Sequence, residues 1–166
     1  MEYGTACILH KGTQILLQER LGDSEDIHQN HWVPPGGHTE PGEVSLDCIL
    51  REFPEETGLT IKNPQFRARV HFNNQGRTLH GEPYAGGKSW TVDFYDALEF
   101  EGELKSESPK IRHKWIEQLD LPQYPMHSGD ILLLDLLLNP NNANKTYSIT
   151  IRYDEEALNE FHVSEL

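Results

Sequence analysis

The chain opens with two apolar runs on either side of a short polar stretch. The runs "YGTACILH" (residues 3–10) and "ILLQER" (15–20) flank "KGTQ" (11–14), which contains the glycine that a tight turn favours. Two strand-like runs joined by so short a connection predict a β-hairpin at the start of the chain.

A long polar stretch follows at residues 21–43. Its sequence, "LGDSEDIHQNHWVPPGGHTEPGE", contains paired prolines and paired glycines, which mark irregular backbone. Because a loop of this length exceeds what a simple connection requires, we expect it to carry function.

From Ser45 the apolar positions take a helical spacing of three and four residues. Ser45 is the expected N-cap, with Asp47 in the first turn, and Gly58 is the expected stop. A helix is therefore predicted over residues 45–57. Its buried stripe is expected to consist of Leu46, Ile49, Leu50 and Phe53.

The rest of the chain alternates strand-like runs with apolar helical ones. A buried helix is predicted at "GDILLLDLLL" (129–138), and a short final helix at "EEALNEF" (155–161). No repeat or linker interrupts this order, so one domain is expected over residues 1–166. Strands are predicted at "FRARVHF" (66–72), "SWTVDFYDALEF" (89–100), "RHKWIEQ" (112–118) and "TYSITIRYD" (146–154), and the Gly-rich stretch at 73–87 stays unassigned.

The composition is that of a soluble globular protein, with 36% apolar and 25% charged residues. A net charge of −13 argues against a nucleic-acid polymer as partner, because phosphate-backbone binding needs clustered Lys and Arg. A small phosphate compound stays compatible with this charge when divalent metal ions lie between the two. The sequence has no run of 18 apolar residues and no secretory signal, so no membrane partner is expected. Cys7 and Cys48 form no metal-spaced pair, which suits a reducing, cytoplasmic location.

Three glutamates lie within one turn of the predicted helix, in "REFPEETG" (51–58). Glu52, Glu55 and Glu56 are spaced i, i+3 and i+4, which places them on one helix face. Carboxylates this close repel one another, and at least one pKa rises unless a cation lies among them. Mg²⁺ and Mn²⁺ prefer such oxygen ligands, so this face is a candidate metal site. A solvent-exposed acidic face without a ligand is the alternative that these residues alone allow.

A proline interrupts the same helix. Pro54 lacks the N–H that would bond the carbonyl of Leu50, a loss of about 3 kcal/mol in an undisturbed helix. We expect a kink or a widened turn over residues 50–54 that leaves the glutamate face intact. A helix that ends at Phe53, with the last two glutamates turned away, is the alternative.

The surrounding sequence has a more specific spacing than the acidic turn itself. Residues 37–59, "GHTEPGEVSLDCILREFPEETGL", follow the pattern G-x5-E-x7-R-E-U-x-E-E-x-G-U, where U is apolar. This stretch resembles the Nudix box of the Nudix hydrolases at every fixed position. The prefix "HWVPPGG" is also similar to the family, apart from its doubled proline.

The resemblance implies an α/β fold, namely a Nudix-type α/β/α sandwich with a mixed β-sheet and a loop-helix-loop catalytic motif. It implies hydrolysis of a nucleoside diphosphate linked to another group, with Mg²⁺ or Mn²⁺ as cofactor. In this pattern the metal ligands are Glu52, Glu55 and Glu56, helped by the carbonyl of Gly37.

Two further roles follow from the same resemblance. Glu56 is our first choice, and Glu55 the second, for the base that accepts a proton from the attacking water. Arg51 is expected to keep the neighbouring carboxylates ionised for the metal, and to form with Glu43 an ion pair that orients the loop.

The second half of the chain carries a weaker resemblance. The segment "KWIEQLDLPQYPMHSGDILLLDLLL" (114–138) resembles MutT-like nucleoside triphosphate diphosphatases, in which the residue that aligns with Asp130 recognises a purine base. Capping of the following helix by Ser128 or Asp130 is the alternative. Arg20 is a candidate phosphate contact, because Arg binds paired oxygens, or else an exposed strand end.

Four other residues receive simpler interpretations. His127 stands where some relatives have an aromatic residue that could stack on a base. Trp32 is expected to pack against its own loop, Trp90 to lie in a strand, and Cys48 to fill a small buried space.

The expected function is therefore Mg²⁺-dependent hydrolysis of a nucleoside triphosphate, oxidised forms included, to the monophosphate and pyrophosphate. An ADP-ribose or other sugar-nucleotide pyrophosphatase is one alternative, and a Nudix domain that senses a nucleotide without hydrolysing it is another. The intact box argues against the sensor. The expected partner is a small nucleotide, and the resemblance allows a homodimer.

Overall fold

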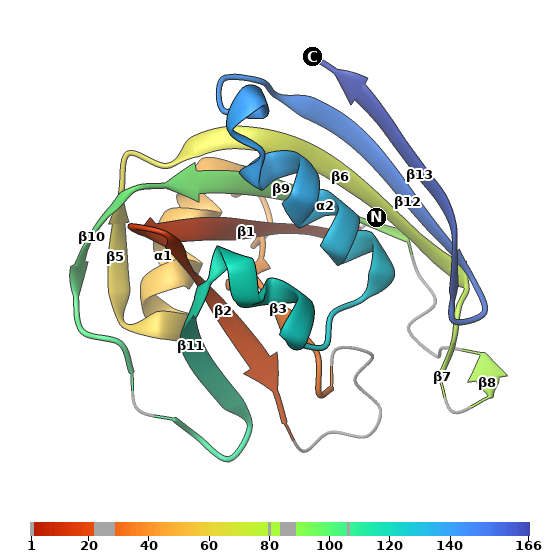
Figure 1. Cartoon of the computed structure of the whole chain (residues 1–166), viewed down its shortest axis with the longest axis horizontal. Coiled ribbons are helices and arrows are strands. Elements are labelled where there is room, and N and C mark those ends of the chain that lie inside the picture. The colour runs from red at the N-terminus through yellow and green to blue at the C-terminus, as the bar shows by residue number, and fades with distance from the viewer. Residues whose placement is uncertain (1, 22–28, 80, 84–88, 106) are drawn as a thin grey trace.

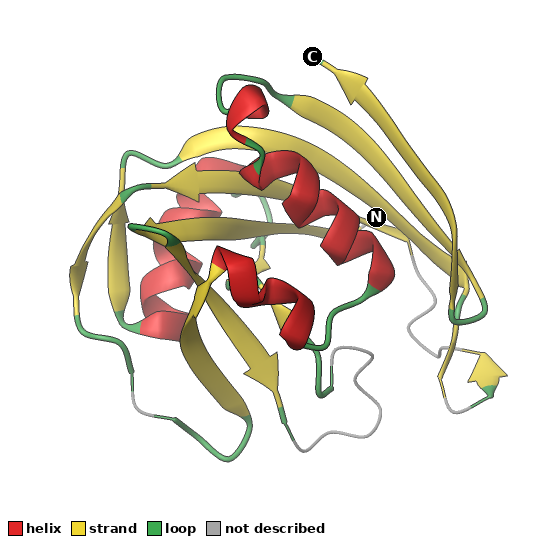
Figure 2. Ribbon diagram, in the orientation of Figure 1, coloured by secondary structure: helices red, strands yellow, loops and turns green. Residues whose placement is uncertain are grey.

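The computed structural model describes residues 2–21, 29–79, 81–83, 89–105 and 107–166. Helices and strands succeed one another in a mixed order (Figure 2). The helices are α1 (Ser45–Thr57) and α2 (Ser128–Leu138), with the 3-10 turns η1 (Gln118–Gln123) and η2 (Pro140–Asn142). The strands are β1 (Glu2–Lys11), β2 (Gln14–Arg20), β3 (Trp32–Val33), β4 (Gly36–His38), β5 (Leu59–Lys62), β6 (Gln65–Gly76), β7 (Thr78–Leu79), β8 (Glu82–Pro83), β9 (Ser89–Ala97), β10 (Glu99–Gly102), β11 (Ile111–Glu117), β12 (Tyr147–Asp154) and β13 (Ala157–Glu165).

A large mixed sheet forms the middle layer of the molecule. Its strand order is β11-β2-β1-β9-β6-β12-β13, with β3 added to β2 and β4 added to β1. β1 pairs with β9, and β6 with β12, in the parallel sense, whereas the other pairs are antiparallel. α1 covers one face of the sheet and α2 the other (Figure 1), which confirms the expected α/β/α sandwich.

β1 shows how the two layers share the sheet. Ala6 and Ile8 belong to the apolar cluster under α2, while Cys7 and Leu9 belong to the cluster under α1. Because side chains of a strand alternate between faces, a strand covered on both sides reads as one apolar run. The predicted hairpin with β2 is confirmed, and Gly12 takes a positive φ of 60° in its turn.

The start of α1 agrees with the prediction except for its cap. Val44 is the N-cap, and Ser45 is the first helical residue. The Ser45 hydroxyl lies 2.6 Å from the Tyr95 hydroxyl of β9, so it joins the helix to the sheet instead of capping it.

The end of α1 settles one of the alternatives for Pro54. The helix runs through Pro54 to Thr57, which excludes an end at Phe53. The N–H of Gly58 donates to the carbonyl of Pro54 at 2.9 Å, and Gly58 takes a φ of 81°, so the predicted stop is confirmed. The kink over residues 50–54 stays a prediction.

The buried face of α1 differs from the predicted stripe. Ile49 and Phe53 are buried as expected, but Leu46 and Leu50 keep 43% and 41% of their surface exposed, and Cys48 is buried instead. The physical reason is that the helix turns Cys48 and Glu52 toward Gly37 of β4, which leaves Leu46 and Leu50 at the rim.

The predicted final helix at 155–161 is wrong, because residues 157–165 form β13 against β12. A tight turn at Glu155, with a φ of 56°, folds the chain back on itself. A bulge in this hairpin shifts the register, so that Leu158 and Phe161 both pack toward the α2 side despite their spacing of three. That spacing imitates the helical period.

Other strands extend or refine the predictions. The predicted strand at 89–100 divides into β9 and β10, and β10 pairs with β5, which the sequence did not predict. The Gly-rich stretch contributes the end of β6 and the short β7–β8 pair. Among the described residues, neither helix has the length and apolar character needed to cross a membrane.

A buried arginine fixes α2 on the sheet. Arg67 of β6 is only 4% exposed, and its Nη1 lies 2.5 Å from Asp96 Oδ2 on β9. Its Nη2 donates to the carbonyls of Leu137 at 3.2 Å and Asn142 at 2.9 Å. Because these carbonyls lie at and just beyond the end of α2, Arg67 holds that end of the helix in place.

Candidate active site

The three glutamates of the acidic turn lie in the second half of α1. Glu52 is turned inward and keeps 16% of its side chain exposed, while Glu55 keeps 61%. The Glu52 carboxylate lies against Gly37 of β4, so close that a methyl group on Gly37 would overlap it. A glycine at position 37 is therefore what allows the helix to bring this carboxylate up to the strand.

Arg51 connects the glutamate face to the loop before the helix. Its Nε and Nη2 donate to the two carboxylate oxygens of Glu43 at 2.8 and 2.9 Å, a bidentate pair. Its Nη1 donates to Glu52 at 2.8 Å and lies 3.4 Å from Glu55, and its Nη2 also reaches the carbonyl of His38 at 3.2 Å. The predicted pair with Glu43 is confirmed, although Glu43 precedes the helix and does not lie on it.

These contacts set the charge state of the loop. The hydrogen bonds from Arg51, and then the backbone N–H of Glu40, lower the pKa of Glu43 to about 2. The same carboxylates raise the pKa of Arg51. Both groups are therefore charged at neutral pH.

Glu56 has the opposite electrostatic environment. Partial burial, and then the negative charge of Glu52, raise its pKa above the usual value of a glutamate. The positive charges of Arg20 and Lys105 oppose this shift. The positive charges near Glu56 therefore do not fully offset the burial and the negative charge that disfavour its ionised form.

The residue types of this face fit a hard divalent cation. In the present conformation no three His, Cys, Asp or Glu side chains of the described residues are arranged so as to hold a metal ion. Glu52 and Glu55 each turn one oxygen toward Arg51, which supplies the positive charge instead. A cation beside the bare backbone of Gly37 would relieve the raised pKa of Glu56 and accept oxygen ligands of this kind.

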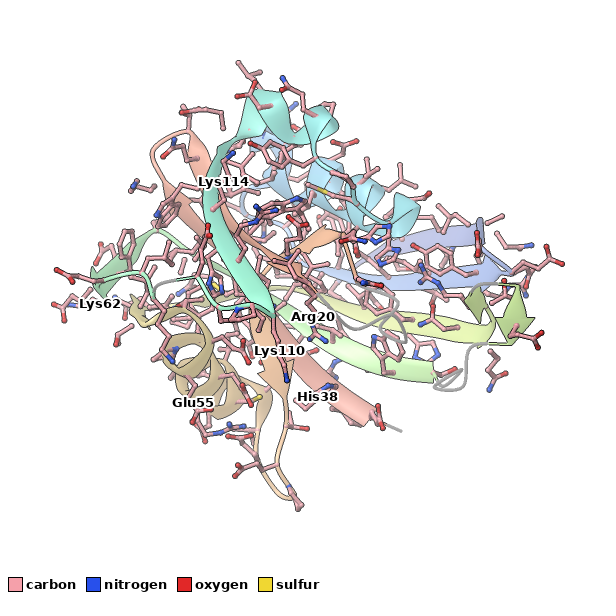
Figure 3. The ribbon with its side chains drawn as sticks, turned by 90° about the horizontal axis from the view of Figure 1, so that it is seen from below. Arg20, His38, Glu55, Lys62, Lys110 and Lys114 are labelled. Carbon is pink, nitrogen blue, oxygen red and sulfur yellow. The ribbon has the colours of Figure 1, made fainter. Side chains whose placement is uncertain are left out.

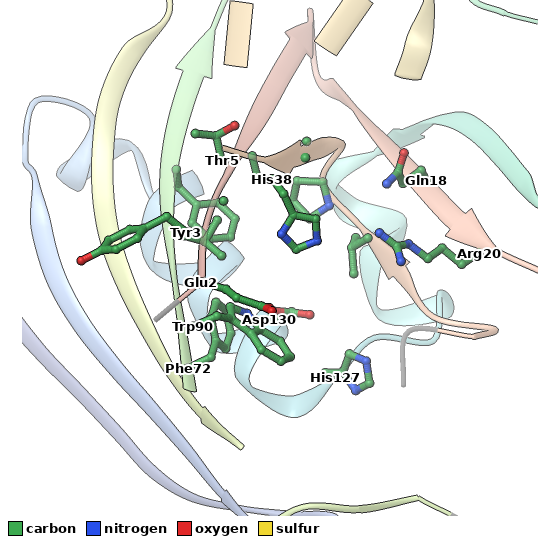
Figure 4. A pocket seen from close by; sticks show the side chains of 18 of the residues that line it. Glu2, Tyr3, Thr5, Gln18, Arg20, His38, Phe72, Trp90, His127 and Asp130 are labelled. Carbon is green, nitrogen blue, oxygen red and sulfur yellow. The ribbon is translucent and has the colours of Figure 1, made fainter. Parts of the chain in front are cut away.

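A cavity of about 300 Å³ reaches Gly37, the residue against which the Glu52 carboxylate lies. Gly37 and His38 of β4 and Arg20 of β2 line one part of it, and Asp130 of α2 lines another. Figure 4 shows these side chains around the space, with Phe72 and Trp90 beside Asp130. Figure 3 shows where Arg20, His38 and Glu55 project from β2, β4 and α1. The fold therefore places the predicted phosphate contact and base contact in one cavity, and the glutamates adjoin it through the contact between Glu52 and Gly37.

Asp130 lies in the first turn of α2, but it does not cap the helix. The N-cap is His127, and no side chain makes a cap hydrogen bond there. Asp130 is only 8% exposed, and burial raises its pKa to about 7, against the lowering effect of the Arg77 charge. The capping alternative for Ser128 or Asp130 is thereby excluded.

Sequence reasoning missed a second charged residue of this cavity. Arg77 follows β6, lines the cavity with Asp130, and is 8% exposed. Its guanidinium lies 4.1 Å from the centre of the Tyr153 ring. The available signal was an arginine within the unassigned Gly-rich stretch, which gives no periodicity that could place it.

The simpler interpretations hold for most of the remaining residues. Trp32 is buried as expected, but it packs edge-on against Tyr124, which lies outside its own loop, with ring centres 5.5 Å apart. Cys48 is buried beside the Thr5 hydroxyl at 3.3 Å. Trp90 lies in β9 as predicted, and it also lines the cavity. His127 stacks face to face on His31 at 4.1 Å, so its ring is part of the cavity wall.

The sequence and the fold match known proteins over most of their length. The model of the NUDIX domain matches residues 2–137. An uncharacterised Nudix hydrolase of Bacillus subtilis, YvcI, is 30% identical over 135 residues, which are 81% of this chain and 77% of YvcI. The crystal structure of a MutT protein from Bacillus halodurans superposes with a TM-score of 0.80 and 26% identity, covering 99% of this chain and 98% of that one.

A third match is more local. The m7GpppN-mRNA hydrolase NUDT17 of Bos taurus is 46% identical over 66 residues, which are 40% of this chain. The matched region is 22% of the length of that hydrolase, so the similarity concerns one part of a longer protein.

Proposed function

Because the chain belongs to the NUDIX family of hydrolases, which act on pyrophosphate bonds of nucleotide derivatives, we propose that it hydrolyses nucleoside triphosphates. The products are the nucleoside monophosphate and pyrophosphate, and oxidised triphosphates fall within the proposed class. One observation carries this proposal. Buried Asp130, Arg20 and Gly37 line a single cavity, and Gly37 lies against the carboxylate of Glu52 on α1.

The metal ligands in this proposal are Glu52, Glu55 and Glu56 with the backbone carbonyl of Gly37. Bound Mg²⁺ or Mn²⁺ supplies charge neutralisation for the phosphate oxygens and makes a water molecule easier to deprotonate. The protein's own contribution is to bring Glu52 onto β4 and to hold the loop through Arg51 and Glu43. The Glu55 side chain is exposed, and among the described residues its one polar contact is to Arg51 at 3.4 Å, so it is able to turn toward a ligand.

Glu56 is the proposed general base, and Glu55 is the second choice. A general base works best when its pKa lies near the working pH, because it is then ionised but still accepts a proton readily. The raised pKa of Glu56 brings it closer to this value. Arg51 acts as the cation that limits repulsion between the carboxylates.

The remaining proposed contacts place the substrate. Arg20 lies close enough to Glu56 to affect its pKa and also lines the cavity, as a phosphate contact next to the reacting group would. Asp130 faces the aromatic part of the cavity, where a carboxyl group can hydrogen-bond the edge of a nucleobase.

A second candidate function is the hydrolysis of ADP-ribose or another sugar nucleotide. A more open hollow of about 860 Å³ lies beside the first cavity and shares Tyr3 and His38 with it. The hollow is lined by polar groups, including the bidentate pair of Arg69 and Asp93, at 2.8 and 2.9 Å. The hydroxyl groups of a sugar linked to the diphosphate could hydrogen-bond to these polar side chains. This polar hollow is the observation that favours the second candidate. A domain that only senses nucleotides is disfavoured because all three glutamates are present.

The decisive test is a product assay with Mg²⁺ over unmodified and oxidised nucleoside triphosphates, ADP-ribose, sugar nucleotides and dinucleoside polyphosphates. Chromatography of the nucleotide products identifies the bond that is cleaved. The proposal is supported if nucleoside triphosphates have the highest kcat/KM. If ADP-ribose has the highest kcat/KM, the second candidate function replaces the first. Tight binding without turnover would identify a sensor.

We also propose that residues 1–166 form a single domain in the cytoplasm, and that two copies can associate. β12 and β13 lie beyond the matched NUDIX region, yet they continue the same sheet through β6, which supports one domain. Cys7 and Cys48 are both free thiols, as suits a reducing compartment. Size-exclusion chromatography with light scattering tests the homodimer.

A further inference from the structure

One end of the cavity is built around Arg77, which is held from three sides. Its Nη1 donates to Asn74 Oδ1 at 3.3 Å, and its Nη2 donates to His127 Nδ1 at 2.6 Å. The guanidinium also lies over the Tyr153 ring at 4.1 Å. Since these contacts fix its plane, Arg77 is a preorganised group.

The bond to His127 also defines a tautomer. A guanidinium can only donate hydrogen bonds, so His127 Nδ1 must accept, and the neutral imidazole carries its proton on Nε2. His127 is in turn stacked on His31. The bond to His127 therefore fixes the orientation of the Arg77 guanidinium on this side of the cavity.

Asp130 is the counterpart of Arg77 in the same space. The Tyr153 ring under Arg77 has its hydroxyl 2.9 Å from the N–H of Gly129, the residue before Asp130. Asp130 has a pKa of about 7, so near neutral pH its carboxyl group is able to accept or to donate. Arg77 lacks this freedom, because it is charged and donates at every relevant pH.

The fixed donor decides which ligand atoms fit. In 6-oxopurines, such as guanine and hypoxanthine, the carbonyl oxygen at position 6 and N7 are neighbouring acceptors, and arginine binds this pair well. In adenine an amino group replaces the carbonyl, so that the acceptor N7 has an N–H donor beside it instead of a second acceptor. A buried guanidinium that faces an amino group loses a hydrogen bond and cannot regain it from water.

Building on the nucleotide substrate proposed above, we propose that Arg77 is a base-specificity residue that donates hydrogen bonds to a carbonyl oxygen of the nucleobase. The aromatic rings of Phe72 and Trp90, whose centres are 6.0 Å apart, line the same part of the cavity and offer apolar surface to the base. Asp130 accepts from the ring N–H next to that carbonyl. The enzyme then favours 6-oxopurine nucleotides over adenine nucleotides.

The test compares inosine triphosphate with ATP, because the two differ only at position 6 and N1 of the base. We expect kcat/KM of the wild-type protein for inosine triphosphate to exceed that for ATP by about 10-fold or more. Arg77→Met keeps much of the side-chain volume but removes the donors, and we expect the ratio to fall to within about 3-fold. Arg77→Lys, with a charge and a less suitable donor, should fall between the two.

Arg152→Met is the matched control. Arg152 lies on β12 next to Tyr153, is 42% exposed and bonds Asn159 outside the cavity, so the ratio should stay at the wild-type value. Inhibition by inorganic tripolyphosphate, which has no base, should be the same for wild type and Arg77→Met. Parallel loss of tripolyphosphate inhibition would show that Arg77 contacts phosphate, which would overturn the proposal.

The experiment distinguishes a failure of the proposed nucleobase preference from a failure of the proposed triphosphate hydrolysis. A wild-type enzyme that hydrolyses ATP as well as inosine triphosphate, or better, contradicts the role of Arg77 and leaves the triphosphatase intact. Should Arg77→Met fail to fold, an unchanged ratio in Arg77→Lys contradicts it equally. An enzyme that hydrolyses none of the triphosphates would instead remove the proposed function itself.

Discussion

The carboxylate of Glu52 occupies the space beside Gly37 in which the side chain of any other residue would begin. This contact joins the helix that carries the acidic residues to the strand whose carbonyl we propose as a metal ligand. The distance between the Glu52 carboxylate and the Gly37 backbone therefore depends on the absence of a single methyl group at position 37.

Gly37→Ala is therefore expected to push Glu52 away from β4 and to weaken Mg²⁺ binding by about 10–100-fold, as disturbance of groups that support a metal site does. The measurement is the Mg²⁺ concentration that gives half-maximal activity, together with thermal unfolding without metal. Unchanged Mg²⁺ dependence in a folded variant would show that the contact has only a packing role.

Glu56→Gln keeps the size of the side chain but removes the base. We expect kcat at saturating Mg²⁺ to fall by at least about 100-fold, since general-base catalysis contributes roughly 10²–10⁴-fold. Glu55→Gln should have a smaller effect on kcat, and Asp47→Asn, exposed in the first turn of α1, should have none. Turnover of Glu56→Gln within a few-fold of wild type would refute the assignment.

Asp130 is expected to make stability depend on pH. Its pKa of about 7 in the folded protein exceeds the usual value near 4 of an unfolded chain, so the folded protein binds more protons between these values. Stability contributed by the neutral acid is fully present below about pH 4 and is lost as the pH rises through 7. The free energy of unfolding of Asp130→Asn minus that of wild type should therefore be more positive at pH 8 than at pH 5.

The size of this effect follows from the shift of roughly three pKa units, which corresponds to about 4 kcal/mol as an upper limit. Urea unfolding of wild type and Asp130→Asn at several pH values measures it. The prediction fails if the difference between the two proteins is the same at pH 5 and pH 8.

Arg67→Met should destabilise the fold by about 3–5 kcal/mol, because it removes the donor of Asp96 Oδ2 and of the carbonyls at the end of α2. Arg152→Met provides the comparison on a solvent-facing position, where a loss below about 1 kcal/mol is expected. Denaturant midpoints of the two variants that coincide would contradict the assigned role of Arg67.

Pro54→Ala should restore the missing hydrogen bond to the Leu50 carbonyl and stabilise the protein by about 1–3 kcal/mol. Because the helix continues to Thr57 with the proline in place, we expect Mg²⁺ dependence to stay within about twofold of wild type. A clear loss of Mg²⁺ affinity in the stabilised variant would show that the proline shapes the glutamate face.

The glutamate face and its arginine were predictable because they lie within one short continuous segment of the chain. The spacing of Glu52, Glu55 and Glu56 and the pairing of Arg51 with Glu43 depend on one helix and the loop before it. The rotation of that helix was not predictable, since it depends on how closely β4 approaches, and Leu50 became exposed as a result.

The rest of the cavity depends on contacts that are distant in sequence. Arg77 and His127 are fifty residues apart, and no periodicity of either segment indicates that they meet. Likewise, the bulge in the last hairpin gave Leu158 and Phe161 a helical spacing within a strand. In both cases long-range pairing, and not local preference, determined the outcome.

The two ends of the cavity are assembled from separate stretches of the chain. α1 packs on β1, β4 and β5, whereas Arg77 follows β6 and Tyr153 and Asp130 come from β12 and α2. Substitutions that remodel one end leave the supports of the other untouched. Such a division lets descendants of one ancestral gene exchange their preferred nucleotide while inheriting the bond-breaking apparatus intact.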